Sequence, residues 1–471
     1  MTATPSMTID GAAVETAATI GVVNPATGAV FAQAPDCSRD QLDAAFAAAD
    51  RAFAAWRRDE DARRTALRAC AAALTARAND IGAILTAEQG KPLGDAVREV
   101  YTAAAWLNYY AGLELPREVI QDDERGLVEV VRRPVGVVAA ITPWNFPLTL
   151  AFWKIAPALR AGNTVVIKPS PYTPLSTLIV GEILRDVLPA GVVNTVSGGD
   201  ELGAWMTAHP LARKISFTGS VATGKHVAAS AAPDLKRVTL ELGGNDAAIV
   251  LDDADPAKIA ERIFWGAFTN SGQVCAAVKR VYVPESLHDD LVEALAAQAK
   301  AVRVGVGTDE GVQLGPVNNK PQFERVNELV EDALAGGAVA VAGGQRLEVG
   351  DGGGYFYAPT ILTGVGNGSR IVDEEQFGPA LPVVTYRDLE ATVDHVNTGR
   401  FGLGGSVWSG DPDRAADVAA RLDVGTAWVN THLALAPNQP FGGAKWSGIG
   451  VENGPWGLYG FTELQVLHRA R

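Results

Sequence analysis

Residues 137–168 read VVAAITPWNFPLTLAFWKIAPALRAGNTVVIK, and this stretch decides the fold. The apolar runs Val137–Ile141 and Thr164–Ile167 predict two strands, and Leu148–Arg160 between them predicts a helix. Two strands joined by such a crossover helix lie parallel in one sheet. The sequence therefore predicts a parallel sheet covered by helices.

The same alternation of apolar runs and helical segments continues towards the C-terminus. It is typical of an α/β fold with helices on both faces of parallel sheets. A second α/β domain is expected to begin near Gly243-Gly244. Further strands are predicted at Val192–Val196, Lys214–Phe217, Val238–Leu240, Ala247–Leu251, Val383–Tyr386, Ser406–Trp408 and Ala427–Asn430, and further helices at Leu175–Val187, Gly224–Ala232, Pro256–Thr269 and Leu287–Val302.

The residues before this region are predicted to be largely helical. Ser38–Gln41 has the form of a capping box, and helical patterns follow at Asp61–Ala78, about Ile81–Glu88 and about Asp95–Leu113. Leu115–Pro134 predicts a hairpin, which is a candidate arm for contact between subunits.

Composition excludes several classes of protein. The chain has 471 residues, a length that suits two or three domains, and a formal net charge of −14. An acidic surface repels phosphate backbones and anionic lipid heads, so we expect neither a nucleic-acid nor a membrane partner. Cys37, Cys70 and Cys275 form no disulfide framework and no metal-ligand pattern, and the N-terminus shows no secretory signal. A cytoplasmic protein without a metal site is expected.

Phe268–Cys275 (FTNSGQVC) brings small and polar residues up to a cysteine. A thiol is a useful nucleophile only if it can ionise, if substrate can reach it, and if a donor meets the charge it creates. Gly272 lets the backbone come close to a ligand. A lone cysteine is nevertheless more often a buried structural residue, so the rest of the chain has to decide between the two interpretations.

Two turns at predicted strand ends carry groups that a ligand could use. Phe217–Gly224 (FTGSVATG) follows a strand and opens a helix, whose first N–H groups can bind a diphosphate. Its spacing differs from G-x-G-x-x-G, and ordinary strand–helix turns also contain Gly and Ser. In Ile141–Pro147 two prolines hold the amide of Asn145, a group that stabilises an oxyanion by roughly 3 kcal/mol. The alternative is an Asn in an ordinary Pro-bracketed turn.

Two acidic residues stand at further turns. Glu241 ends a strand within Thr239–Asn245, where desolvation moves a carboxylate towards the range of a general base; the alternative is a strand-end Glu exposed to water. In Asp373–Pro379 a carboxylate and the ring of Phe377 could take ribose hydroxyls and a flat cofactor, unless the run is simply solvated. No H-E-x-x-H, C-x-x-C or G-K-[ST] pattern supports metal hydrolase, dithiol or P-loop chemistry.

Taken together, six motifs in this order resemble the NAD(P)-dependent aldehyde dehydrogenase superfamily, in its hydrolytic, non-acylating type. The resemblance runs from about Val23 to the C-terminus. The motifs are Pro143–Pro147 (PWNFP), Phe217–Ser220 (FTGS) with Gly224, Glu241–Gly244 (ELGG), Gly272–Cys275 (GQVC), Glu375–Pro379 (EQFGP) and Pro440–Gly443 (PFGG).

The resemblance implies two Rossmann-type α/β domains and a β arm for oligomerisation, as a homodimer or homotetramer. Residues 1–114 and 135–243 would form the dinucleotide-binding domain, and residues 244–455 the catalytic domain. Residues 115–134 and 456–471 would form the arm.

The resemblance also implies the roles of three residues. Cys275 would be the nucleophile, Glu241 the general base, and Asn145 would share the oxyanion hole with the Cys275 backbone N–H. The thiolate would add to an aldehyde, hydride would pass to the cofactor, and water activated by Glu241 would hydrolyse the thioester to a carboxylic acid.

The implied cofactor is NAD, with NADP as the open alternative. Lys168 would meet the adenosine ribose and Glu375 the nicotinamide ribose. Pro171 stands where NAD-preferring members often have Glu, and Asn245 replaces the usual Lys without a physical account from the sequence. The residues expected at the cofactor are Ile141, Thr142, Pro143, Trp144, Lys168, Ser170, Pro171, Gly219, Ser220, Gly224, Leu242, Gly243, Glu375 and Phe377.

Alignment with the family predicts an apolar approach to Cys275. It has no Arg aimed at a distal carboxylate, although Lys279 or Arg280 could come near. An apolar aliphatic or aromatic aldehyde is therefore favoured over a semialdehyde acid. The predicted lining residues are Phe146, Trp153, Val274, Leu435 and Phe441.

Three rival functions remain. A coenzyme A-acylating dehydrogenase would release the same thioester to a thiol, but such members typically lack a Glu at position 241. A fold retained for binding or structure would be expected to lose Cys275, Glu241 or Asn145. A cysteine hydrolase needs a partner for the thiol, and none of the six histidines lies in a motif that indicates one.

Overall fold

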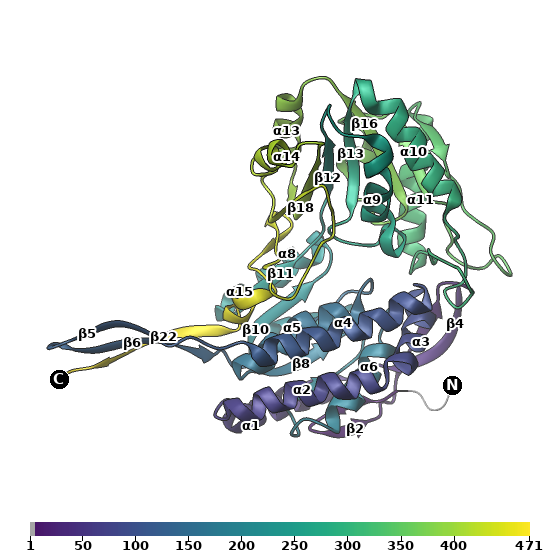
Figure 1. The fold of residues 1–471 in the computed structure, drawn as a ribbon. Helices are drawn as coiled ribbons and strands as arrows, with labels where there is room; N and C mark the ends of the chain where they lie inside the picture. The colour runs from purple at the N-terminus through teal and green to yellow at the C-terminus, as the bar shows by residue number, and fades with distance from the viewer. Residues whose placement is uncertain (1–4) are drawn as a thin grey trace.

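The computed structural model describes residues 5–471. Two α/β units lie one above the other in Figure 1, and a narrow β arm projects to the left.

The lower unit is built on an eight-stranded sheet of order β2-β1-β9-β8-β7-β10-β11-β21, in which β9, β8, β7, β10 and β11 run parallel. The β7–α5–β8 crossover confirms the prediction from residues 137–168. The strands are β1 (Met7–Ile9), β2 (Ala12–Val14), β7 (Val137–Ile141), β8 (Thr164–Lys168), β9 (Val193–Thr195), β10 (Ala212–Thr218), β11 (Arg237–Glu241) and β21 (Gly448–Ile449); the crossover helices are α5 (Pro147–Ala161), α6 (Leu175–Arg185), α7 (Asp200–Ala208) and α8 (Val221–Ala231).

Four helices precede the parallel strands of this sheet in sequence. They are α1 (Arg39–Trp56), α2 (Glu60–Ala76), α3 (Ala78–Gln89) and α4 (Leu93–Gly112). Ser38 and Gln41 form the predicted capping box at the start of α1. The prediction missed β1 and β2, which have only three residues each and so carry little periodicity, and it missed the hairpin of β3 (Thr19–Asn24) and β4 (Ala29–Pro35).

The upper unit is built on a seven-stranded sheet of order β14-β15-β16-β13-β12-β18-β19, parallel except for β14. Its central strand β13 was not predicted, because Lys279 and Arg280 interrupt the apolar run; both side chains are buried. The strands are β12 (Asp246–Val250), β13 (Val278–Pro284), β14 (Val339–Ala342), β15 (Thr360–Thr363), β16 (Ala380–Tyr386), β18 (Gly404–Trp408) and β19 (Thr426–Val429); the helices are α9 (Pro256–Phe268), α10 (His288–Ala301), α11 (Lys320–Ala335), α12 (Arg370–Asp373), α13 (Leu389–Thr398) and α14 (Pro412–Ala419).

The arm is a three-stranded antiparallel sheet. Strands β5 (Glu118–Asp123) and β6 (Gly126–Pro134) form the predicted hairpin, and β22 (Thr462–Arg469) pairs with β6 from the C-terminal end. The remaining elements are β17 (Phe401–Gly402), which pairs with β20 (Ala444–Lys445), and α15 (Gly454–Tyr459), which precedes β22. No helix within residues 5–471 has both the length and the apolar character to span a membrane.

Candidate active site

Cys275 lies between α9 and the central strand β13, after a tight turn. Asn270, Ser271 and Gly272 all adopt left-handed backbone angles, with φ of 52°, 56° and 73°. A Cβ on Gly272 would lie 2.2 Å from the carbonyl oxygen of Gly378, so only glycine fits there. This turn delivers the partly exposed Cys275 to the space between the two α/β units.

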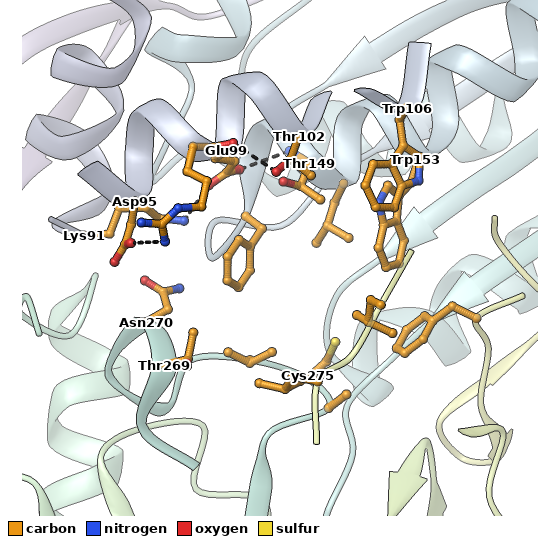
Figure 2. Close-up of a pocket in the computed structure, with 18 residues that line it drawn as sticks. Lys91, Asp95, Glu99, Thr102, Trp106, Thr149, Trp153, Thr269, Asn270 and Cys275 are labelled. Carbon is orange, nitrogen blue, oxygen red and sulfur yellow. Dashed lines mark hydrogen bonds and ion pairs between the residues drawn. The ribbon is translucent and has the colours of Figure 1, made fainter. Parts of the chain in front are cut away.

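Two cavities meet at Cys275. The first has a volume of about 360 Å³ and the second of about 390 Å³, and Cys275 lines both. Figure 2 shows the first cavity, with Cys275 on one side and Trp106 and Trp153 across from it. One molecule could therefore approach the thiol from each side.

The first cavity contains all five residues predicted for the substrate approach: Phe146, Trp153, Val274, Leu435 and Phe441. Lys279 and Arg280 are not among its lining residues. The prediction missed the contribution of α4 to the lining. The α4 residues that line the cavity are spaced by three or four and therefore lie on one helical face. That face consists of Asp95, Arg98, Glu99, Thr102 and Trp106; the remaining lining residues are Lys91, Thr149, Leu150, Thr269, Asn270, Ala276 and Leu433.

The second cavity contains eight of the residues predicted for the cofactor, together with Asn145. They are Pro143, Trp144, Gly219, Ser220, Leu242, Gly243, Glu375 and Phe377.

Six predicted cofactor residues do not line this cavity. Ile141 ends β7, the N–H of Thr142 donates to the Lys168 carbonyl at 3.1 Å, and the Ser170 hydroxyl accepts from the N–H of Tyr172 at 3.3 Å. Burial lowers the pKa of Lys168 to about 8, against the opposing effect of Asp200 and Asp36. Pro171 is half-buried in the turn after β8, and Gly224 lies in α8 with its Cα facing Leu242, where a Cβ would lie 2.5 Å from Cδ2.

The second cavity fits a dinucleotide. The rings of Trp144 and Phe377 meet edge to face at 5.3 Å and offer a surface to a flat group. Glu375 accepts the N–H of Gly244 at 3.0 Å, and a Cβ on Gly243 would lie 2.2 Å from its carboxylate. Ser220 caps α8 by accepting from the N–H of Thr223, so a helix N-terminus, which favours phosphate, opens at the same wall.

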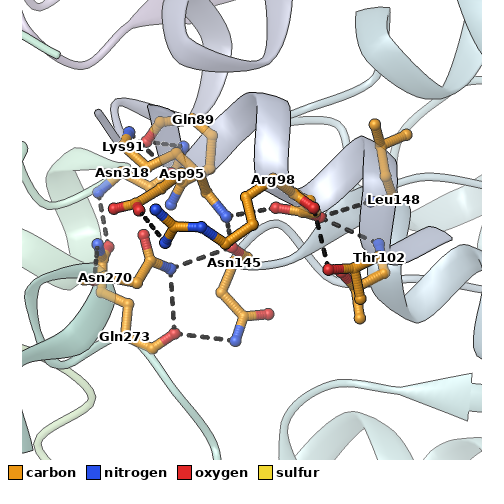
Figure 3. Close-up of polar contacts among 12 residues, drawn as sticks. Gln89, Lys91, Asp95, Arg98, Thr102, Asn145, Leu148, Asn270, Gln273 and Asn318 are labelled. Atoms are coloured by element: carbon orange, nitrogen blue, oxygen red, sulfur yellow. Dashed lines mark hydrogen bonds and ion pairs between the residues drawn. The ribbon is translucent and has the colours of Figure 1, made fainter. Parts of the chain in front are cut away.

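Asn145 is held by contacts from both α/β units (Figure 3). Its side-chain N–H donates to the carbonyl of Gln273 at 2.9 Å. Its backbone carbonyl accepts from Lys91 Nζ at 2.9 Å and from Asn270 Nδ2 at 3.0 Å. Because an amide group has two N–H donors, one remains after the bond to Gln273. Asn145 and Cys275 line the same cavity, so that donor and the thiol face a common space.

A buried ion pair supports Asn145 from behind. Lys91 Nζ lies 2.5 Å from Glu99 Oε2, and each side chain is only 2% exposed. The other oxygen of Glu99 accepts the N–H groups of Leu148 and Thr149 at 2.9 and 3.1 Å, in the first turn of α5. The sequence did not reveal this pair, because its partners lie on separate segments.

Glu241 ends β11 and is buried, outside the lining of both cavities. Neither carboxylate oxygen has a hydrogen-bond partner among the described residues. Burial and the neighbouring Glu452 raise the pKa of Glu241 well above its ordinary value, while Lys154 opposes this rise. Lys154 and Glu452 themselves form a buried ion pair at 2.6 Å.

The surroundings of Cys275 disfavour a thiolate. Burial raises the pKa of the thiol to about 12, and Glu241, Glu375 and Asp246 act in the same direction. Lys279 acts against them. Within residues 5–471, no group of three His, Cys, Asp or Glu side chains is arranged to hold a metal ion.

Asn245 gains a physical account from the structure. Its side-chain N–H donates to the carbonyl of Val372 at 2.9 Å, and its backbone carbonyl accepts from Arg280 Nε at 3.1 Å. It therefore ties the start of β12 to α12, which leads to Glu375.

Comparisons with known proteins point to one family. The model of the family described as "Aldehyde dehydrogenase family" matches residues 13–467. A phenylacetaldehyde dehydrogenase of Pseudomonas fluorescens is 39% identical, over 95% of this chain and 92% of its own length. A glutarate-semialdehyde dehydrogenase of Pseudomonas putida is 38% identical, over 95% of this chain and 94% of its own length. A solved structure of betaine aldehyde dehydrogenase from Staphylococcus aureus in complex with NAD+ is 33% identical, with a TM-score of 0.95 over 99% of this chain and 94% of that one.

The Lys91–Glu99 pair leads to a stability prediction. Lys91→Met should lower the free energy of unfolding by about 3–5 kcal/mol, because it leaves the Glu99 carboxylate buried without its partner. Urea unfolding followed by tryptophan fluorescence measures this loss. Arg98→Met is the matched control on α4, since its pair with Asp95 is largely exposed and should contribute much less. Equal effects of the two substitutions would contradict the prediction.

Proposed function

The chain belongs to the aldehyde dehydrogenase family, and we propose that it oxidises an apolar aldehyde to the carboxylic acid through a thioester on Cys275. Membership makes it an NAD(P)-dependent aldehyde oxidoreductase, as the six motifs predicted. One observation above all supports the proposed chemistry: Cys275 stands where a substrate cavity and a cofactor cavity meet.

The first step is addition of the Cys275 thiolate to the aldehyde carbonyl. The carbonyl oxygen becomes negatively charged as the carbon–sulfur bond forms. The remaining N–H of the Asn145 side chain and the Cys275 backbone N–H stabilise this oxyanion, as donors do in comparable sites. Because the Asn145 amide is already fixed to Gln273, little reorganisation is needed when the charge develops.

When bound, NAD(P)+ supplies the hydride acceptor for the oxidation. Glu375, Phe377 and Trp144 would hold its nicotinamide end, and the N-terminus of α8 its diphosphate. Lys168, at the end of β8, would meet the adenosine ribose. The NAD+ complex of the related structure supports NAD as the cofactor, while Pro171 leaves NADP open.

The second step is hydrolysis of the Cys275 thioester. Glu241 removes a proton from water, the resulting hydroxide adds to the thioester carbon, and the carbon–sulfur bond breaks to release the acid. A carboxylate with a raised pKa is better suited to this role than an ordinary one, because its driving force for accepting a proton is larger.

Glu241→Gln tests this assignment. Deacylation should become slow, so the acyl group should accumulate on Cys275 and appear as added mass on the intact protein. In the unsubstituted enzyme, turnover should fall as pH drops through the raised pKa of Glu241, since the base is then protonated. Cys275→Ser is the control: it should bind NAD+ but neither oxidise aldehyde nor gain the acyl mass. Fast turnover of Glu241→Gln would remove Glu241 as the base, and acyl-CoA formation upon addition of coenzyme A would favour the acylating alternative.

The substrate cavity supports an apolar aldehyde. Its lining includes Val274 and Ala276, the neighbours of Cys275 in sequence, and Phe441, whose ring lies 5.3 Å from that of Trp153. The lining face of α4 extends from Trp106 to Asp95, and the rise per residue of an α-helix makes the distance between these two positions about 16 Å.

The end of the substrate cavity near Asp95 carries charged side chains of opposite sign, which pair with one another. Lys91 pairs with Glu99, and Arg98 lies 2.7 Å from Asp95. The expectation was an approach with no Arg aimed at a distal carboxylate; Arg98 lines the cavity, but its acidic partner Asp95 weakens it as a receptor for a carboxylate. A semialdehyde acid, the substrate of the Pseudomonas putida relative, is the alternative that Arg98 keeps open.

An aldehyde panel distinguishes the two substrate classes. Hexanal, benzaldehyde and phenylacetaldehyde should each exceed succinic and glutaric semialdehyde in kcat/KM by about tenfold or more, because the lining near the thiol is apolar. Absorbance of the reduced cofactor measures the rates, with NAD+ and NADP+ in parallel. Preference for a semialdehyde, lost in Arg98→Met, would instead assign Arg98 to a distal carboxylate.

We further propose that residues 115–134 and 456–471 join subunits, and that residues 1–114 with 135–243, and 244–455, form the two domains, except that β21 (Gly448–Ile449) joins the sheet of the first domain. The arm exposes apolar side chains, with Ile120, Leu464 and Val466 each at least 60% exposed.

Leu464→Asp should therefore lower the molar mass measured by light scattering. Leu235→Asp, at an 88% exposed position outside the arm, should leave the mass unchanged. An unchanged mass in Leu464→Asp together with Val466→Asp would contradict the role of the arm.

A further inference from the structure

Lys279 occupies an unusual place for a charged residue. It lies in β13, the central strand of the seven-stranded sheet, in which every residue is buried. Strands of parallel sheets are covered on both faces and are usually apolar. The Lys279 side chain is only 2% exposed, and lysine is rarely buried to this degree without a partner. Its contacts should therefore explain its presence.

The ammonium of Lys279 lies between the segment that carries Cys275 and the segment that carries Glu375 and Phe377. It donates a hydrogen bond to the backbone carbonyl of Val274, the residue before Cys275. It also lies 4.0 Å from Glu375 Oε1 and 5.3 Å from the centre of the Phe377 ring. The backbone carbonyl of Lys279 accepts from Gln376 Nε2 at 3.1 Å, which adds a second link to the same segment.

The charges around Cys275 give this contact a chemical consequence. The groups that raise the thiol pKa are all acidic, and Lys279 is the group among the described residues that lowers it. Burial lowers the pKa of Lys279 itself, while Glu375, Asp246 and Cys275 favour its charged form. The titratable groups around Lys279 and Cys275 lie on several elements: Glu241 on β11, Asp246 on β12, Glu375 on the segment after α12, and His432, 4.0 Å from Asp246, on the loop after β19.

We propose that Lys279 is a positioning residue of the reaction: its buried ammonium stabilises the Cys275 thiolate, anchors the Val274 carbonyl and holds Glu375 at the cofactor cavity. The proposal rests on Cys275 being the nucleophile. None of the six motifs contains this cation. Lys279 contacts the backbone just before the nucleophile and does not line the substrate cavity.

Alkylation of Cys275 tests the proposal without aldehyde or cofactor. Iodoacetamide is added to the full-length enzyme between pH 7 and 9, and the labelled Cys275 peptide is quantified by mass spectrometry. Lys279→Gln keeps a hydrogen-bond donor but removes the charge, so the pKa of the Cys275 thiol should rise further. At these pH values the rate of alkylation should therefore fall by about tenfold or more. Lys279→Arg keeps the charge and should restore most of the rate.

Cofactor binding provides the second readout. Trp144 lines the cofactor cavity, so quenching of tryptophan fluorescence reports the Kd for NAD+. The Kd should rise in Lys279→Gln, because Glu375 loses its neighbouring cation, and should rise less in Lys279→Arg. If Lys279 had a purely structural role, the Kd for NAD+ would not depend on whether the substituted side chain carries a positive charge.

Arg280→Gln is the matched control for both readouts. Arg280 is the next residue in β13 and is also buried, but it donates to the Asn245 carbonyl instead of the Cys275 segment. It should leave the alkylation rate unchanged. An unchanged rate in folded Lys279→Gln, or an equal fall in Arg280→Gln, would overturn the proposal.

Two further comparisons cover folding and the underlying function. If Lys279→Gln does not fold, Lys279→Met is introduced into a Glu375→Gln variant and compared with Glu375→Gln alone. In this background position 375 has no carboxylate that would lose its neighbouring cation. Alkylation of the double variant should again be slower, and an equal rate in the two would overturn the proposal. Failure of the proposed function is separate, because it would appear as aldehyde oxidation by Cys275→Ser, whatever the alkylation rates of the Lys279 variants.

Discussion

The close approach of the Gly272 backbone to the Gly378 carbonyl is the constraint on which the active site depends. It leaves room only for glycine at 272, within a turn of three left-handed residues that leads the chain from the end of α9 towards β13. The turn brings Cys275 against the segment that carries Glu375 and Phe377. The same turn supplies Asn270 and Gln273, which hold Asn145 from the other unit. Cys275, at the end of this turn, lines both cavities.

Buried charges extend that arrangement through both units. Lys91 with Glu99 and Lys154 with Glu452 each place a cation and an anion in the interior, and Lys279 is a buried cation beside Glu375 at the wall of the cofactor cavity. Buried pairs of this kind contribute little net stability, because desolvation offsets their attraction. Their value here is geometric and electrostatic: the first fixes Asn145, the second acts on Glu241, and the third links the segments of Cys275 and Glu375.

The features that could be predicted from sequence are those that depend on residues close together in the chain. The β7–α5–β8 crossover, the capping box at Ser38 and the hairpin of the arm were all legible, because periodicity and turn chemistry are local. The five residues predicted around the substrate were found by family resemblance and all line the cavity. The polar face of α4 was missed because its spacing identifies a face but not what the face meets. Strand β13 was missed because two basic residues interrupt it, and only the assembled sheet shows that Lys279 has partners there.

The pairing of β6 with β22 has a consequence for synthesis of the chain. Eight residue pairs join the two strands, yet more than three hundred residues separate them in the sequence. During synthesis β6 therefore emerges long before β22. Until β22 arrives, the hairpin carries an open strand edge, of the kind that other chains can pair with. Completion of the arm therefore comes after the parallel strands of the first sheet have had time to fold.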